Sequence, residues 1–195
     1  MKTQNTRDRI LEASLKIFSQ KGFLRATTKE IARRAEVAEV TIFRLFSSKD
    51  KLVQEVIRHH TFLPILQEIL PDLIRMDHRQ ALEMIARRFL ERLEERKAFI
   101  RILHAEGFRY SARVKSRYFR SMGESIHTLA SYFLHCQQRG LLREFKPEIG
   151  AEAFLGMFFS LFLMQVLLPP RDLKAMDREE IFREFIDIFF RGTVK

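Results

Sequence analysis

The stretch Thr27–Lys49, TTKEIARRAEVAEVTIFRLFSSK, decides the fold of the N-terminal part of the chain. Glu30 follows Thr27 by three residues, which is the spacing of a capping box, so a short helix is expected to begin at Thr27 or at the threonine after it. Beyond a three-residue turn, Ile42 and Phe46 are four residues apart and therefore share one face of a second short helix. Two helices joined in this way form a helix-turn-helix.

The segments on either side of this stretch are expected to be helices that support it. Residues 6–21 carry apolar side chains at helical spacing, and Gly22 stands where a C′ glycine ends a helix. One serine of the pair Ser47–Ser48 is expected to cap the next helix. Pro64 is expected to kink that helix, and Pro71 to end or restart it.

The rest of the chain also has helical periodicity, and no alternating strand pattern with turn chemistry appears. The predicted fold class is therefore all-α, with about nine helices. We expect an N-terminal three-helix domain at residues 1–50 and a second helical domain at residues 51–195, with the boundary inside the linking helix.

Composition predicts a soluble globular protein with an anionic partner. Hydrophobic residues make up 46% and charged residues 31% of the 195 residues, which does not fit a disordered chain. The net charge of +10 is uneven, because residues 1–52 hold 12 Lys and Arg against 6 Asp and Glu. Such a basic segment favours nucleic acid, an acidic membrane surface or an acidic ligand.

The sequence offers little for an enzyme or a cofactor. It has no Gly-rich phosphate loop, no HExxH motif and no nucleophile elbow, so we expect no enzyme, no cofactor and no metal site. The single cysteine, Cys136, excludes an internal disulfide and fits a reducing cytoplasm. We interpret it as a buried structural thiol, with a redox switch as the open alternative.

A membrane location is not expected. The N-terminus, MKTQNTRDRI, has no apolar run of the kind that a signal peptide needs, which favours the cytoplasm. The uncharged stretch at residues 153–170 is short for a membrane span, so a buried or subunit-facing helix is favoured. A membrane-associated regulator that uses this stretch is the alternative.

Four segments follow one another within residues 7–52: RILEASLKIFSQKGF, TTKEIARRAEV, TIFRLF and SKDKL. In this order and spacing they resemble the N-terminal DNA-binding domain of the TetR family of one-component transcriptional regulators. The resemblance implies a homodimer that binds a near-palindromic operator on double-stranded DNA, with repression as the family default. It also implies a C-terminal domain for ligand binding and dimerisation, where a small hydrophobic molecule releases the DNA.

Four positions depart from the family's usual residues, and one of them is Leu45, which replaces a more polar residue. Glu36 stands where a glycine is common, and a left-handed conformation there would cost on the order of 1 kcal/mol. Ala38 replaces a serine that often caps the second helix of the motif. Phe43 replaces a tyrosine whose hydroxyl meets a phosphate, and it is expected equally as a core residue or as a contact.

The expected DNA contacts fall into a positioning group and a reading group. Arg44 can pair with a guanine, the Val40 and Thr41 methyl groups can meet thymine methyls, and Glu39 can accept from cytosine or remain a solvated charge. Dimerisation would place two reading helices about 34–36 Å apart in successive major grooves. Residues expected to hold phosphates are Arg25, Thr27, Thr28, Lys29 and Lys49; those expected to face bases are Glu39, Val40, Thr41 and Arg44, with Phe43 as a further contact if it is not a core residue.

Two further sets of residues are predicted for the C-terminal domain. Fifteen of the 19 Phe lie beyond residue 52, which is more than a small core readily hides. Phe residues at helical spacing in the last two helices are assigned to a dimer interface, with ordinary core as the alternative: Phe154, Phe158, Phe162, Phe182, Phe185 and Phe189. An apolar effector cavity with a polar end is assigned to Phe62, Phe89, Leu103, His104, Phe108, Tyr118, Met122 and Phe133. The rival function is a ligand-blind DNA-binding or architectural protein.

Overall fold

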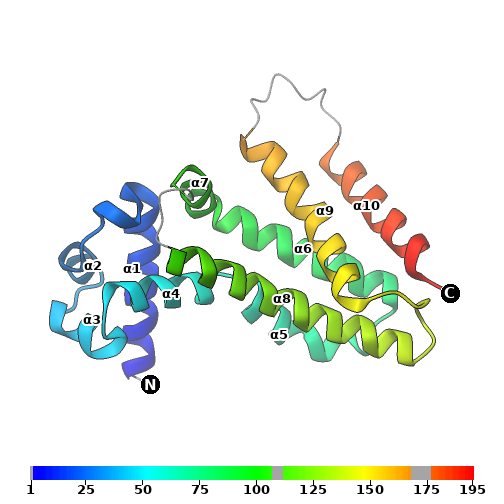
Figure 1. The fold of residues 1–195 in the computed structure, drawn as a ribbon, viewed down its shortest axis with the longest axis horizontal. Coiled ribbons are helices and arrows are strands. Elements are labelled where there is room, and N and C mark those ends of the chain that lie inside the picture. Colours follow the sequence, from blue (N-terminus) through cyan, green and yellow to red (C-terminus); the bar gives the residue numbers. More distant parts are fainter. Residues whose placement is uncertain (1, 107–111, 168–176) are drawn as a thin grey trace. The chain divides into compact units, whose positions relative to one another are not determined.

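The computed structural model describes residues 2–106, 112–167 and 177–195 (Figure 1). These residues form helices joined by short connections, and an isolated bridge between Leu142 and Val194 is the only strand-like pairing among them. The all-α class is confirmed. The helices are α1 (Lys2–Arg25), α2 (Thr28–Arg34), α3 (Glu39–Phe46), α4 (Lys49–His59), α5 (Leu63–Leu73), α6 (His78–Glu95), α7 (Lys97–Glu106), α8 (Ala112–Gln138), α9 (Pro147–Leu167) and α10 (Arg178–Thr193).

The described residues thus hold ten helices where about nine were expected, and the proline-rich segment accounts for the difference. The expected long helix is interrupted, since α4 ends at His59 and α5 begins at Leu63. Pro64 lies in the first turn of α5, where a missing N–H costs nothing. Pro71 was expected to end or restart a helix, but it lies inside α5.

The chain divides into two compact units. Unit 1 contains residues 1–61 and 96–121, and unit 2 contains residues 62–95 and 122–195. All of α4 and α7 therefore falls in unit 1, although the sequence suggested a boundary near residue 50. The division into functional domains at that residue stays a prediction.

Unit 1 is built around α1, which packs on α2, α4 and α7. Gly22 has φ of 75°, so the regular part of α1 ends there as the glycine predicted. Phe23 then turns inward and contacts two other rings, Phe18 at 4.7 Å and Phe99 of α7 at 5.5 Å between centroids. This aromatic group joins α7 to the core of the helix-turn-helix unit.

Unit 2 has an aromatic core between α8, α9 and α10. Phe133 of α8 contacts Phe154 and Phe189, with centroids 6.3 and 5.6 Å apart. Phe154 and Phe189 are themselves 4.8 Å apart in an edge-on arrangement, and Phe158 continues the stack towards Phe182. Such ring pairs add stabilisation beyond the burial of their area.

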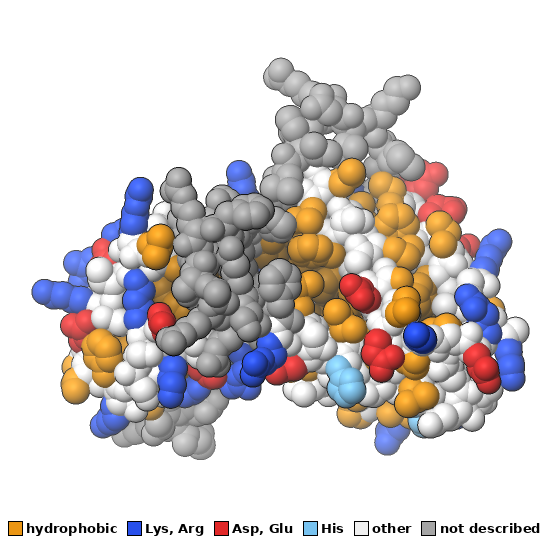
Figure 2. Space-filling view, viewed as in Figure 1, with side chains coloured by type: hydrophobic (Ala, Val, Ile, Leu, Met, Phe, Trp, Pro, Cys, Tyr) orange, Lys and Arg blue, Asp and Glu red, His pale blue; other side chains and the backbone are white. Residues whose placement is uncertain are grey.

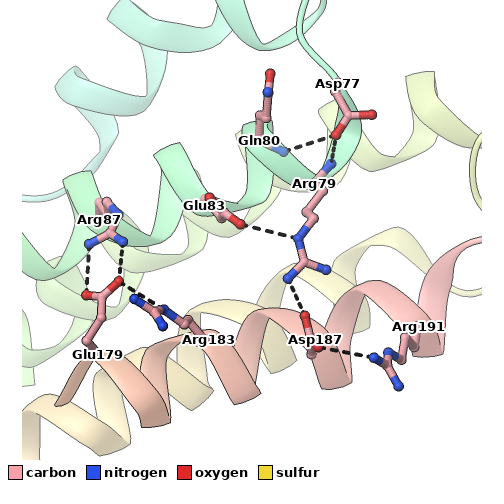
Figure 3. Close-up of polar contacts among 9 residues, drawn as sticks. All are labelled: Asp77, Arg79, Gln80, Glu83, Arg87, Glu179, Arg183, Asp187 and Arg191. Atoms are coloured by element: carbon pink, nitrogen blue, oxygen red, sulfur yellow. Dashed lines mark hydrogen bonds and ion pairs between the residues drawn. The ribbon is translucent and has the colours of Figure 1, made fainter. Parts of the chain in front are cut away.

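Ion pairs also join α6 to α10 (Figure 3). Arg87 binds Glu179 through two hydrogen bonds of 2.6 and 3.2 Å, and its guanidinium lies 4.3 Å from the centre of the Phe182 ring. About two turns earlier in α6 and two turns later in α10, Arg79 pairs with Asp187. Exposed pairs contribute little individually, so their main effect is to fix the register of α10 on α6.

Among the described residues, one segment, Pro147–Met164 of α9, is long and apolar enough to cross a membrane by length and composition. Only 33% of that segment is buried. The buried face carries Phe154, Phe158 and Phe162 into the core of unit 2, as a helix of a globular protein would.

Candidate DNA-binding surface

The capping box at the start of α2 is present as predicted. Thr27 is the N-cap: its hydroxyl accepts from the backbone N–H of Glu30, and the Glu30 carboxylate accepts from the backbone N–H of Thr27. Glu30 also pairs with Lys21 of α1. The hydrogen bond from Lys21, followed by those from Thr27, lowers the pKa of Glu30 to about 2.

The turn between α2 and α3 contains a backbone conformation that is unfavourable for a residue other than glycine. Glu36 has φ of 54°, so a glutamate occupies the left-handed region where glycine is common. Arg9 of α1 supports this turn, because its Nη2 donates to the carbonyl of Ala35 at 2.5 Å and to that of Glu36 at 3.3 Å. These carbonyls end α2, so the guanidinium acts as a cap supplied from another helix.

Helix α3 has the two-sided character that the motif requires. Ile42 and Phe46 are buried in the core of unit 1. On the opposite side Val40 is 71% exposed and Phe43 46% exposed, and the side chain of Arg44 is exposed as well. Phe43 therefore lies at the surface rather than in the core.

Thr28 and Glu39 lie in contact, although they were assigned separate roles. Thr28 Oγ1 donates to Glu39 Oε1 at 2.6 Å, which links the start of α2 to the start of α3. Ala38, the N-cap of α3, makes no side-chain capping bond, as its methyl group predicted. The Thr28–Glu39 pair thus connects the two helix starts at the point where the usual cap is missing.

The remaining basic residues lie at the beginning of α4 and near the end of α1. Ser48 caps α4 by accepting from the N–H of Lys51. Lys49, the first residue of α4, reaches the carbonyl of Leu24 at 3.5 Å, and partial burial lowers its pKa. Arg25 and Lys29 are exposed, while Thr41 is half-buried. In Figure 2, Lys and Arg side chains project around the α2–α3 end of unit 1.

Sequence reasoning missed two contacts of this surface. Arg9 was not among the residues given a role from the sequence, whereas in the structure it caps the turn. Thr28 and Glu39 were given separate partners. Neither contact has a local signal, because the partners are 26 and 11 residues apart.

The residues assigned to an effector cavity are only partly brought together. Phe62 and Phe89 are buried and pack edge-on, with centroids 5.0 Å apart. Phe133 belongs to the aromatic core of unit 2, and Met122 is half-buried. The side chains of the other four lie outside the described residues: Leu103, His104, Phe108 and Tyr118.

A pocket in unit 2 lies at a place that the sequence did not indicate. Its volume is about 290 Å³ and it is bordered by α6, α9 and α10. Leu90, Leu161 and Phe182 supply its apolar lining, while Arg87 and Glu179 stand at its charged rim. None of the residues assigned to the effector cavity lines it.

The phenylalanines assigned to a dimer interface lie mainly inside one protomer. Phe154 and Phe158 are fully buried, and Phe162, Phe182 and Phe189 are at most 7% exposed. Phe185 alone is half-buried. Five of the six are therefore core residues of unit 2, which was the alternative interpretation. An interface on these helices would have to use their outward-facing side chains.

Comparison with known proteins places this architecture in a family. Residues 10–56 match the profile of the bacterial regulatory proteins of the tetR family. Residues 80–192 match that of the C-terminal domain of AefR-like transcriptional repressors. These two matches span most of the chain, so the protein belongs to the TetR family of DNA-binding transcriptional regulators.

Relatives and solved structures agree with this assignment. The chain is 29% identical over 191 residues to YvkB of Bacillus subtilis, an HTH-type transcriptional regulator, covering 96% of both chains. It is similar in fold to the flavonoid-responsive regulator FrrA, with a TM-score of 0.71, 25% identity and 97% of each chain covered. It is also similar in fold to the Bacillus subtilis regulator FadR in complex with stearoyl-CoA, with a TM-score of 0.74, 14% identity and coverage of 94% and 97%.

Proposed function

We propose that the protein is a dimeric, ligand-responsive transcriptional repressor that binds a near-palindromic operator and is released by a small hydrophobic molecule. The observation that carries this proposal is the two-sided α3. Its buried Ile42 and Phe46 hold the helix in unit 1, while Val40, Phe43 and Arg44 are left exposed on the other side. A short helix held in this way is what enters a major groove.

The exposed side chains of α3 suit base reading. Arg44 has the fork geometry that pairs bidentately with guanine, and Val40 offers a methyl surface for thymine. Phe43 supplies apolar surface beside them rather than the hydroxyl that the family often has. Glu39 is held by Thr28 in the free protein, so reading cytosine with Glu39 requires that this hydrogen bond open.

The positioning contacts come from the residues that flank the motif. Lys49, at the first turn of α4, together with exposed Arg25 and Lys29, presents cations near the reading helix. Thr27 and Thr28 stand at the start of α2. Contacts of this kind set the salt dependence of binding and not its sequence preference.

The dimer surface that we propose is the outward side of α9. Apolar and small residues recur there at helical spacing and all are exposed in a single chain: Ile149, Ala153, Gly156, Ser160 and Met164. A Cβ at Gly156 would meet nothing within 4 Å in the protomer, so the space beside it is open to a partner. On α10, Ile188 is 59% exposed. Beyond Glu152, α9 has no charged residue up to its end at Leu167, and a helix without a polar side is normally buried all round.

The proposed effector is an apolar molecule that binds in unit 2. The support comes from relatives of the same fold, one flavonoid-responsive and one holding stearoyl-CoA, and from the aromatic interior of unit 2. The buried Phe62 and Phe89 remain the candidate lining within the described residues. We propose no enzymatic role, and we propose the cytoplasm as the location.

Selection of DNA from a random pool with the purified full-length chain tests this function, followed by a screen of acyl-CoA thioesters and flavonoids for release. We expect an inverted repeat to be enriched and at least one apolar compound to lower its occupancy. Binding without sequence preference that no compound changes would instead support the ligand-blind alternative.

A further inference from the structure

Three side chains of unit 1, none of them assigned to DNA, bring metal-ligating atoms together. Glu12 lies on α1, His59 is the last residue of α4, and His60 follows directly. One ligand atom from each lies within 4.8 Å of the other two. His60 Nε2 is 3.9 Å from Glu12 Oε1, and the His60 side chain is completely buried.

We infer that Glu12, His59 and His60 form a binding site for a divalent transition-metal ion of the Zn²⁺ type. Two imidazoles and one carboxylate are a donor set that Zn²⁺ uses in proteins, with a fourth position open. Asp8 lies one turn before Glu12 on α1, and its Oδ1 is 4.0 Å from His59 Nε2. The Asp8 carboxylate or a water molecule can therefore complete a tetrahedral shell.

The geometry needs only a small contraction to hold the ion. Bond lengths near 2.1 Å in a tetrahedral site place neighbouring ligand atoms about 3.4 Å apart. The cluster must therefore close by roughly 1.4 Å from its present spread. Glu12 and His59 can supply this movement, because their side chains are 45% and 41% exposed and can turn about their own bonds.

Charges of both signs surround the cluster. Asp8 and Glu12 bring two carboxylates, and the C-terminal end of α4, where both histidines stand, carries a partial negative charge. Cations oppose the ion, because Arg96 Nη2 lies 3.5 Å from Glu12 Oε1 and Lys16 and Arg9 line one groove with Glu12. Arg9 is engaged at the carbonyls of Ala35 and Glu36, and the ion would use the Glu12 oxygen that Arg96 does not bind.

A bound ion would tie the end of α4 to α1. The two helices already pack against each other in unit 1, and the ion would add a cross-link 48 residues apart in the chain, between Glu12 and His60. An ion that binds the folded chain and not the unfolded chain stabilises it by mass action. The metal therefore raises the unfolding temperature, whether or not the chain is bound to DNA.

Isothermal titration of the chelator-treated, full-length protein with Zn²⁺ tests the site, with Co²⁺ as a spectroscopic probe. We expect one ion per chain, the visible absorption of tetrahedral Co²⁺, and a higher unfolding temperature. Glu12→Gln keeps the shape of a half-exposed side chain and should weaken Zn²⁺ at least tenfold, as should His60→Gln. His127→Gln, at an exposed histidine of α8, is the matched control and should keep the wild-type affinity.

Two outcomes would overturn the inference. One is the absence of saturable Zn²⁺ binding by the wild-type chain, which would leave the cluster as an ion-pair network of Glu12, Arg96 and the histidines. The other is an affinity that Glu12→Gln leaves unchanged. Because metal and protons compete for imidazole, lowering the pH from 7.5 to about 5.5 should weaken binding, and a pH-independent affinity would count against histidine ligands.

Discussion

At the scale of single residues, Arg44 and Lys49 should differ in what their loss does to DNA binding. Arg44→Ala removes a base-reading fork and should weaken specific binding by about 1–3 kcal/mol while relaxing one operator position. Lys49→Ala removes a phosphate contact and should weaken all sequences alike, with a shallower dependence on salt. Fluorescence anisotropy on the selected operator and on random DNA separates the two effects.

Arg75→Ala is the control for this pair, because Arg75 is an exposed arginine of unit 2 and should leave both affinities unchanged. Equal losses on operator and random DNA for Arg44→Ala would remove its reading role and leave it a phosphate contact.

The left-handed Glu36 gives a second prediction at this scale. Its φ of 54° is strained for a residue with a Cβ, so Glu36→Gly should raise the free energy of unfolding by about 0.5–1 kcal/mol. Glu124→Gly, at an exposed position inside α8, should lower it by a similar amount. Urea unfolding measures both. A loss in both variants would mean that the ion pair between Glu36 Oε2 and Arg9 Nη2, 3.4 Å apart, outweighs the strain.

At the scale of one element, the capping box of α2 should make stability depend on pH. The pKa of Glu30 is lowered from 4.5 to about 2, so its stabilising effect is complete above pH 4.5 and is lost as the pH falls towards 2. Wild type should therefore lose more stability across this window than Glu30→Gln does. Thermal unfolding at a series of pH values measures the difference.

Glu148→Gln in the first turn of α9 is the matched control for the pH series, since it leaves the α2 box intact. If Glu30→Gln kept the full acid sensitivity of the wild type, the Lys21 and Thr27 contacts would not govern the ionisation of Glu30.

The same elements show which parts of the fold a sequence can predict. The helix ends at Gly22, at Thr27 and at the serine pair before α4 could be predicted from the sequence. Each of these ends depends on residues only a few positions apart, so their spacing is enough to locate it. Arg9 and Phe99 act through contacts with distant segments. Helical periodicity showed that their helices have a buried side, but not which other helix would cover it.

At the scale of the whole molecule, the interface residues show the same limit. The recurrence of phenylalanine in α9 and α10 predicted a large buried surface, and that surface exists within one protomer. The pattern could not separate a core from a subunit contact, because both bury apolar side chains with a helical period. The exposed stripe on α9 cannot be predicted from the sequence, because the sequence does not show which side of that helix the protomer buries. Figure 2 shows hydrophobic side chains on the visible face of α9.

The α9 stripe leads to a prediction for the assembled protein. Gly156→Arg places a long cation where a partner helix would approach, and the open space beside Gly156 lets the protomer accommodate it. We expect light scattering to show a shift from dimer to monomer at micromolar concentration, with the helical circular dichroism unchanged. Specific DNA binding should fall with it, since a monomer reads only one half-site.

Ser131→Arg, at an exposed position of α8, adds the same charge to unit 2 and should leave the dimer intact. The two variants carry equal net charge, so a difference between them reports the location of the contact and not electrostatic repulsion in general. If the wild type were monomeric, or if both variants stayed dimeric, α9 would not be the interface. If Gly156→Arg bound the operator with wild-type affinity, the recognition of two half-sites would not depend on the α9 contact.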